Sequence, residues 1–159
     1  MPESETLTLA DAAATEASGA RLGEALALAD DSAALVVYLS GELGSGKTTL
    51  VRGALRSFGV GDTIRSPTYA LIETYGIGGR TLAHLDLYRL SSPRELETLG
   101  VRDLLLPRHV LFVEWPERGA GELPEPDVAA RLNFQGEART LHVDACSVRG
   151  RDVVQRWFR

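Results

Sequence analysis

Residues 34–48 read ALVVYLSGELGSGKT, and this stretch decides the fold that we predict. The run 34–39 is continuously apolar and rich in valine and leucine, which is typical of a strand buried on both faces of a parallel sheet. A glycine-rich loop follows directly, and residues 48–58 then predict a helix that ends at Gly59. Strand, loop and helix in this order indicate an α/β fold.

The segments on either side extend the same fold. Alternation or short apolar runs predict further strands at 6–9, 69–75, 81–87, 110–113, 130–134 and 141–144. A turn at 76–80 with three glycines makes the second and third of these an antiparallel hairpin. One helix is predicted from Asp11 or Thr15 to about Ala29, and the capping box SPRE predicts another over 92–99. We therefore predict a single domain over residues 1–159, similar to phosphate-loop NTPases, with a mostly parallel central sheet, an antiparallel hairpin and flanking helices.

The composition is typical of a globular protein and indicates the compartment in which it works. The chain has 159 residues, of which 44% are hydrophobic and 25% charged, with a net charge of −5. An acidic chain is a poor candidate for gripping nucleic acid by itself, since such binding needs a basic surface. The longest apolar run, 33–39, is far shorter than the ~20 residues of a membrane span. With one cysteine, Cys146, and an acidic N-terminus unlike a signal peptide, we expect a cytoplasmic protein that does not enter a membrane.

The glycine-rich loop predicts a phosphate site. Residues 41–48 fit the pattern Gly-x-x-x-x-Gly-Lys-[Ser/Thr], in which backbone N–H groups and a helix N-terminus face a polyphosphate. Lys47 is the only lysine among 17 basic residues, and a compact cation suits a tight phosphate cradle better than arginine does. The Thr48 hydroxyl is placed to bind Mg²⁺, and Thr49 to donate to an inner phosphate. The residues expected to bind ATP are Gly41, Glu42, Leu43, Gly44, Ser45, Gly46, Lys47, Thr48 and Thr49.

Two acids end predicted strands and are candidates for the metal and the reaction. Glu114 follows the apolar strand VLFV, and Asp86 follows TLAHL. Magnesium takes oxygen ligands, usually one or two carboxylates together with phosphate. One acid would bind the metal, and the other would order a water molecule of its shell or the attacking water. The sequence leaves open which does which.

Four other positions carry weaker signals. Thr68, in the segment SPTY, suits a switch loop that senses a phosphate, although for this segment alone a strand-entry turn is favoured. Trp115 follows Glu114 and is expected either over the site or in the core. For His84 we favour a structural role over a catalytic one. Arg89 is either a phosphate-facing cation or part of a surface pair.

Four motifs between Gly41 and Glu117, GELGSGKTTL, SPTY, HLDLYRL and VEWPE, together resemble one family. In order and spacing they are similar to the bacterial TsaE (YjeE) ATPases, which take part in making threonylcarbamoyladenosine in tRNA. The resemblance implies a protein that binds ATP and Mg²⁺, hydrolyses ATP slowly when alone, and docks on a complex of TsaB and TsaD. It would reach tRNA only indirectly, because TsaD performs the transfer to the adenosine beside the anticodon. Position 19 is a glycine where the resemblance leads us to expect a threonine.

The resemblance also implies roles for individual residues. These are Lys47, Asp86 and Glu114 as catalytic groups, Thr48 and Glu114 as metal ligands, and Thr68 and Trp115 as a switch residue and a residue beside the site.

Two other functions fit the same loop. A small-molecule kinase would use it, but no arginine-rich lid segment lies between the hairpin and the strand 110–113. A nucleotide-gated binding module would bind ATP without useful turnover. A GTPase is disfavoured, because the only asparagine, Asn133, is followed by Phe134 rather than by the lysine of the guanine signature. We predict the accessory ATPase.

Overall fold

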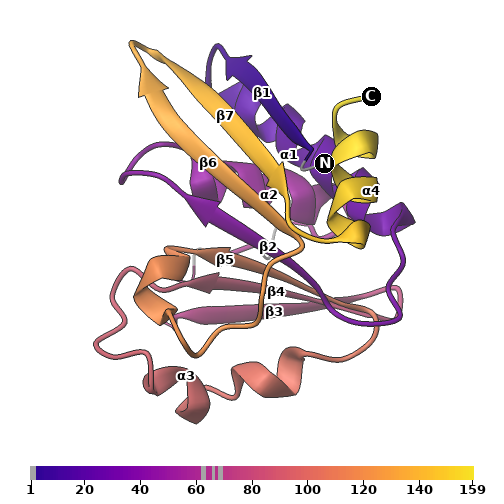
Figure 1. Ribbon diagram of the computed structural model, residues 1–159, viewed down its shortest axis with the longest axis vertical. Helices are drawn as coiled ribbons and strands as arrows, with labels where there is room; N and C mark the ends of the chain where they lie inside the picture. Colours follow the sequence, from indigo (N-terminus) through magenta and orange to yellow (C-terminus); the bar gives the residue numbers. More distant parts are fainter. Residues whose placement is uncertain (1–2, 62–63, 66, 68–69) are drawn as a thin grey trace.

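The computed structural model describes residues 3–61, 64–65, 67 and 70–159. These residues form a seven-stranded sheet with helices on both faces, in the strand order β1-β7-β6-β2-β5-β4-β3 (Figure 1). The strands are β1 (Ser4–Leu9), β2 (Leu35–Ser40), β3 (Ile72–Ile77), β4 (Arg80–Asp86), β5 (His109–Glu114), β6 (Val128–Gln135) and β7 (Ala138–Ala145). The helices are α1 (Ala12–Leu28), α2 (Lys47–Ser57), α3 (Glu95–Thr98) and α4 (Val148–Trp157), with short 3₁₀ turns η1 (Val101–Leu104) and η2 (Pro116–Gly119).

The strand directions confirm the predicted fold class. The four central strands β6, β2, β5 and β4 are parallel to one another. Strand β3 pairs with β4 antiparallel, as the glycine-rich turn predicts, and β7 and β1 extend the other edge antiparallel. The centre of the sheet is therefore a parallel α/β unit, and an antiparallel hairpin lies at each side of it.

The core lies on both faces of the central strands. Strand β2 is buried on both of its faces. Leu35, Val37 and Leu39 face α1, α2 and α4, while Val36 faces α3 and η1. Strand β5 divides in the same way, with Phe112 on the first side and Leu111 on the second. A strand covered on both faces needs apolar residues at every position, which explains the uninterrupted run in the sequence.

Several predicted boundaries need correction. The two strands near the C-terminus are longer than predicted, because β6 and β7 form one tight hairpin. Of the predicted helix over 92–99, only the four residues of α3 are helical. Before it, Glu95 Oε1 accepts from the N–H groups of Ser91 and Ser92. After it, Gly100 leaves the helical conformation with φ 74°. The start of the predicted strand 69–75 at Tyr69 lies outside the described residues.

The sequence prediction missed helix α4. Ser147 caps it by accepting from the N–H of Gly150, and Val153, Val154 and Trp157 lie on its buried face. The Trp157 Nε1–H donates to the Ser18 carbonyl oxygen at 3.0 Å, which fixes α4 against α1. A Ser cap followed by apolar residues at helical spacing was the available signal.

Helices α1 and α2 approach closely through glycines. A Cβ atom built on Gly19 would lie 2.0 Å from the Leu50 carbonyl oxygen, and one on Gly53 would lie 2.1 Å from the Glu16 carbonyl oxygen. Neither position has room for a side chain, which gives a physical reason for glycine rather than threonine at position 19. Asp11, and not Thr15, caps α1 by accepting from the N–H of Ala14.

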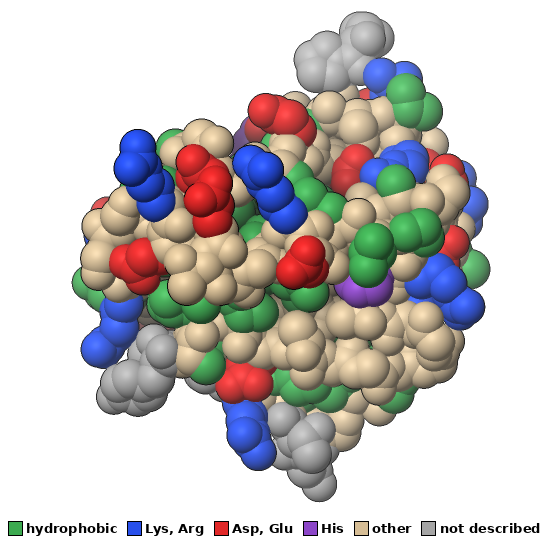
Figure 2. All heavy atoms as spheres, turned by 90° about the horizontal axis from the view of Figure 1, so that it is seen from below, with side chains coloured by type: hydrophobic (Ala, Val, Ile, Leu, Met, Phe, Trp, Pro, Cys, Tyr) green, Lys and Arg blue, Asp and Glu red, His purple; other side chains and the backbone are tan. Residues whose placement is uncertain are grey.

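The surface near α3 has mixed charge. Figure 2 views the molecule from that side and shows acidic and basic side chains interspersed among small apolar groups. In the described part of the chain, no helix is long and apolar enough to cross a membrane.

We predict that Gly19→Ala destabilises the protein by about 2 kcal/mol, because the added methyl group overlaps the backbone of α2. The melting temperature should fall by about 4 to 8 °C. A matched control is Gly76→Ala in β3, where a Cβ would meet nothing within 4 Å. Equal melting temperatures for the two variants in thermal unfolding would contradict the close contact between α1 and α2.

Candidate functional site

Three parallel strands end side by side at one edge of the sheet. Strands β2, β4 and β5 end at Ser40, Asp86 and Glu114, and Asp86 and Glu114 are direct neighbours in the pairing of β4 with β5. The loop after β2 leads into α2, so the start of this helix faces both acids. Such an edge, at the carboxyl ends of parallel strands, is where open α/β sheets bind ligands.

The glycine-rich loop needs its glycines. Gly41, Gly44 and Gly46 have φ values of 144°, 79° and 108°, a backbone region that side chains rarely allow. Gly46 is the N-cap of α2, so Lys47 is the first residue of the helix. The free N–H groups of this first turn and the positive end of the helix dipole favour an anion here.

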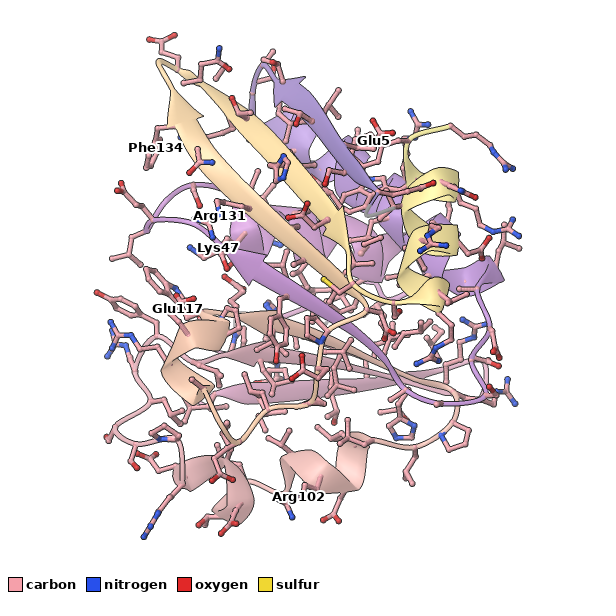
Figure 3. The ribbon with its side chains drawn as sticks, in the orientation of Figure 1. Glu5, Lys47, Arg102, Glu117, Arg131 and Phe134 are labelled. Carbon is pink, nitrogen blue, oxygen red and sulfur yellow. The ribbon has the colours of Figure 1, made fainter. Side chains whose placement is uncertain are left out.

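A hollow of about 470 Å³ lies over this edge. It is lined by Leu43, Gly44, Gly46, Lys47, Thr48, Thr49, Asp86, Tyr88, Arg89, Glu114 and Trp115. The structure therefore brings together both candidate acids, the lysine, the threonines and the tryptophan. Arg89 lines the hollow as well. In Figure 3, Lys47, Glu117 and Arg131 lie along this edge, whereas Arg102 lies apart from them on η1.

Other predicted residues lie outside this hollow. Gly41 and Glu42 line a neighbouring hollow of about 340 Å³ on the side of Trp115 and Arg131. Ser45 is fully buried, and its Oγ has no hydrogen-bond partner within the part of the chain that the structure describes. Thr68 lies outside the described residues.

Glu114 is held from two sides. The Thr48 hydroxyl lies 3.1 Å from Glu114 Oε1 and 3.0 Å from Oε2, and His84 Nε2 lies 2.5 Å from Oε2. Both His84 and Glu114 are almost completely buried. The sequence analysis favoured a structural role for His84, and it did not predict the contact with Glu114. Position 84 shares a strand face with Asp86, and this alternation was the only available signal.

Burial and neighbouring charges shift two pKa values at the site. Burial raises the pKa of Asp86 above its ordinary 3.8, and the adjacent Glu114 carboxylate raises it further. The N–H of Tyr88, which donates to Asp86 Oδ1, opposes this shift in part. Burial also lowers the pKa of Lys47, while the carboxylates of Glu114 and Asp86 oppose that change.

One aromatic ring lies against the lysine. Lys47 Nζ donates to the carbonyl oxygens of Gly41 and Glu42 at 2.5 and 3.0 Å and lies 4.4 Å from the centre of the Trp115 ring. The Trp115 ring lies 5.0 Å from that of Tyr88. Trp115 itself has φ 57°, a left-handed conformation that turns the chain sharply after Glu114. Trp115 thus lies next to Lys47 and lines the hollow.

A second, smaller hollow lies behind the glycine-rich loop. Its volume is about 130 Å³, and its lining includes Asp11 and Thr15 from the start of α1 and Glu137 and Arg139 from the β6–β7 hairpin. Arg139 also donates to the Gly44 carbonyl oxygen at 3.4 Å. The sequence analysis did not predict this wall, because its two segments lie more than 100 positions apart.

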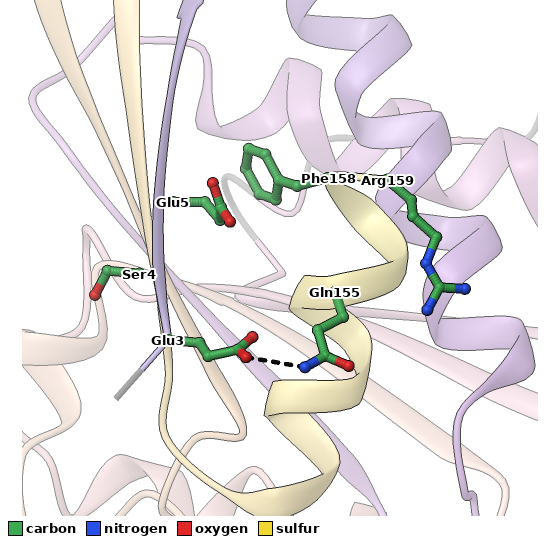
Figure 4. A pocket seen from close by; sticks show the side chains of 6 residues that line it. All are labelled: Glu3, Ser4, Glu5, Gln155, Phe158 and Arg159. Atoms are coloured by element: carbon green, nitrogen blue, oxygen red, sulfur yellow. Dashed lines mark hydrogen bonds between the residues drawn. The ribbon is translucent and has the colours of Figure 1, made fainter. Parts of the chain in front are cut away.

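A further hollow, of about 480 Å³, lies between β1 and α4 (Figure 4). Glu3 and Glu5 line it, and the Glu3 carboxylate accepts from Gln155 Nε2 at 2.9 Å. Its two carboxylates outnumber its one arginine, Arg159, which disfavours a phosphate group. It also lies away from the loop and the strand ends, so the first hollow is the better candidate site.

The donors at the site suit a hard cation with additional ligands. In the described residues, no group of three or more His, Cys, Asp or Glu side chains could hold a metal ion. The Thr48 hydroxyl at the start of α2 and the Glu114 carboxylate at the end of β5 instead offer oxygen ligands for a cation that also binds phosphate or water.

Fold and site together define an α/β protein in which a glycine-rich loop leads into a helix at the carboxyl edge of parallel strands. The family model described as threonylcarbamoyl adenosine biosynthesis protein TsaE matches residues 9–142. The chain therefore belongs to the TsaE family, which takes part in the biosynthesis of threonylcarbamoyladenosine in tRNA. This confirms the family resemblance of the four motifs.

Individual relatives agree with this assignment. A tRNA threonylcarbamoyladenosine biosynthesis protein TsaE of Haemophilus influenzae is 40% identical over 136 residues, which cover 86% of each chain. A protein of the same description from Streptomyces coelicolor is 40% identical over 118 residues, 72% of this chain and 76% of that protein. A crystal structure of YdiB from Bacillus subtilis matches with a TM-score of 0.78 over 99% of this chain and 96% of that one. At 24% identity, this last likeness supports the fold alone.

We predict that Asp86→Asn raises the melting temperature at pH 7 by about 2 °C, because it removes a charged group that burial and Glu114 disfavour. An acid with a raised folded-state pKa destabilises the fold above that pKa, and the cost disappears below the ordinary value of 3.8. The difference from wild type should therefore vanish as the pH falls toward that value. Asp103→Asn, at an exposed acid of η1, is the control. A lower melting temperature at pH 7 would mean that attraction to Lys47 outweighs the burial.

Proposed function

We propose that this protein is a Mg²⁺-dependent ATPase that supports threonylcarbamoyl transfer to tRNA by acting on a complex of TsaB and TsaD homologues. One observation carries the proposal. The Thr48 hydroxyl and the Glu114 carboxylate lie within hydrogen-bond distance of each other, beside Lys47 and at the N-terminus of α2. A hydroxyl, a carboxylate and an ammonium group at a helix start are what a metal–polyphosphate complex requires.

The loop has the properties of a phosphate site. Its three left-handed glycines turn the backbone around the start of α2, and the buried Ser45 Oγ has no hydrogen-bond partner among the described residues. Lys47 is held by two carbonyl oxygens of the same loop, so its ammonium group already lies at the cradle. In the proposal the phosphates lie over this turn, and Lys47 Nζ donates to them instead of to the two carbonyl oxygens.

The acids divide the remaining work. Thr48 and Glu114 would bind Mg²⁺, which supplies neutralisation of the charge that develops on the phosphate oxygens. Asp86 lies beside Glu114 on the neighbouring strand and is the second acid at the hollow. We assign to Asp86 the orientation of the attacking water, directly or through the shell of the cation, because its carboxylate opens into the hollow.

The nucleoside would extend toward the smaller hollow behind the loop. Thr15, Thr49 and Arg139 line this hollow together with Gly44 and Gly46. Thr49 lines both hollows, so a ligand held at the first turn of α2 can reach either side.

Family membership supports the role of the ATPase in the pathway. The relatives from Haemophilus influenzae and Streptomyces coelicolor are described as tRNA threonylcarbamoyladenosine biosynthesis proteins. In our proposal, ATP hydrolysis by this chain is slow alone and drives repeated turnover of the TsaB–TsaD pair. The chain contacts tRNA only through that complex.

We predict that Lys47→Ala lowers ATP hydrolysis tenfold or more, because the phosphates lose their compact cation. Phosphate release is measured for the chain with and without a TsaB–TsaD pair. Arg102→Ala, at an exposed cation of η1, is the matched control and should behave as wild type. Wild-type turnover in Lys47→Ala would refute the assignment of the site. Phosphate appearing on an added nucleoside or metabolite, without stimulation by the pair, would favour the kinase instead.

We also predict that Glu114→Gln raises the Mg²⁺ concentration needed for half-maximal hydrolysis by about tenfold or more, since an amide is a weaker ligand than a carboxylate. The measurement is a magnesium titration of phosphate release at saturating ATP. Glu97→Gln, at an exposed acid of α3, is the control. An unchanged magnesium requirement would remove Glu114 from the metal site.

A further inference from the structure

Among the residues that the structure describes, the His84 side chain has one polar contact, and that contact is the carboxylate of Glu114. The His84 side chain is 1% exposed, and its Nε2 lies 2.5 Å from Glu114 Oε2. Its other ring nitrogen, Nδ1, is buried and has no hydrogen-bond partner in the described residues. A buried histidine that serves only the fold commonly satisfies both nitrogens, so this arrangement points toward the acid.

The unpaired nitrogen decides where the ring proton lies. A proton on Nδ1 would be a buried donor without an acceptor, and such donors are rarer and more costly than unfilled acceptor sites. Nε2 therefore carries a proton and donates it to Glu114 Oε2. The structure thus defines His84 as a donor to one named oxygen of the acid.

The Thr48 hydroxyl would be shared between the acid and the cation. In the free protein it lies 3.0 and 3.1 Å from the two oxygens of Glu114. In the proposed function a lone pair of the same oxygen also binds the metal. His84 is the contact that serves the carboxylate alone, on its buried side, because β4 holds it beside β5.

We infer that His84 is a positioning residue, which binds Glu114 Oε2 and so presents Oε1 to the cation. The inference rests on the proposed function, since it assumes that Glu114 binds a metal. Groups that orient a metal ligand commonly change metal affinity 10- to 100-fold. His84 does not touch the nucleotide in this proposal, so nucleotide affinity without metal should not depend on it.

Two substitutions separate the hydrogen bond from the packing. His84→Gln keeps an N–H donor at a similar reach, whereas His84→Leu fills the space without a donor. His109→Leu, at the opposite end of β5, is the matched control. Mn²⁺ binding is measured by electron paramagnetic resonance in the presence of a non-hydrolysable ATP analogue, and binding of the analogue alone is measured in EDTA.

We expect His84→Leu to weaken Mn²⁺ binding by about tenfold or more, with analogue binding in EDTA unchanged. His84→Gln should recover Mn²⁺ affinity to within about threefold of wild type, as the control does. Wild-type Mn²⁺ affinity in His84→Leu overturns the inference, and so does an equal loss in both variants when their melting temperatures match wild type. Failure of the wild-type protein to bind the analogue refutes the proposed function instead.

A measurement on the free wild-type protein needs neither nucleotide nor a variant. Long-range ¹⁵N–¹H NMR of the histidine rings distinguishes the two neutral tautomers. A proton on Nε2 of His84 supports the inference, and a proton on Nδ1 overturns it even if ATP binds and is hydrolysed.

Discussion

The contacts of the Glu114 carboxylate join the elements on which the site depends. This acid ends β5, accepts from Thr48 at the start of α2, and lies against His84 of β4. A carboxylate that is only 2% exposed is costly unless hydrogen bonds compensate for the lost water. The helix start and both strand ends must therefore keep their mutual register for the fold to tolerate this group. The same register places Lys47 and Asp86 at the hollow, so stability and the proposed chemistry depend on one arrangement.

The balance of charge at this edge favours a bound cation. Asp86 and Glu114 are neighbours across β4 and β5, and their mutual repulsion contributes to the raised pKa of Asp86. Lys47 is the cation at the start of α2, and its own pKa is lowered by burial. A divalent cation between the acids and a polyphosphate would relieve the repulsion and shield the incoming negative charge. The free protein thus keeps an unfavourably placed Asp86 carboxylate, which the proposed metal–phosphate complex would stabilise.

Local patterns predicted most of the elements, but not the contacts between distant segments. The apolar run of β2 and the glycine spacing predicted a buried strand, a phosphate-binding loop and a helix in that order. The partner of His84 depends on the register of β4 against β5, which alternation alone does not specify. The wall formed by Thr15 and Arg139 depends on a hairpin folding back over the loop, and no local pattern encodes that return. Helix α4 was missed although its cap and apolar face are local signals.

The proposed dependence on a partner has a physical reason in the position of the hollow. Leu43, at its rim, is 59% exposed, and Trp115 and Asp86 are only partly buried, so water reaches the site freely. Hydrogen bonds and charges act more strongly on a transition state when water is excluded. Lys47 is also engaged with two carbonyl oxygens and the Trp115 ring, and these contacts must be exchanged before the ammonium group serves a phosphate. A protein surface placed over this edge would exclude water and favour that exchange, which would make hydrolysis faster in the complex than in the chain alone.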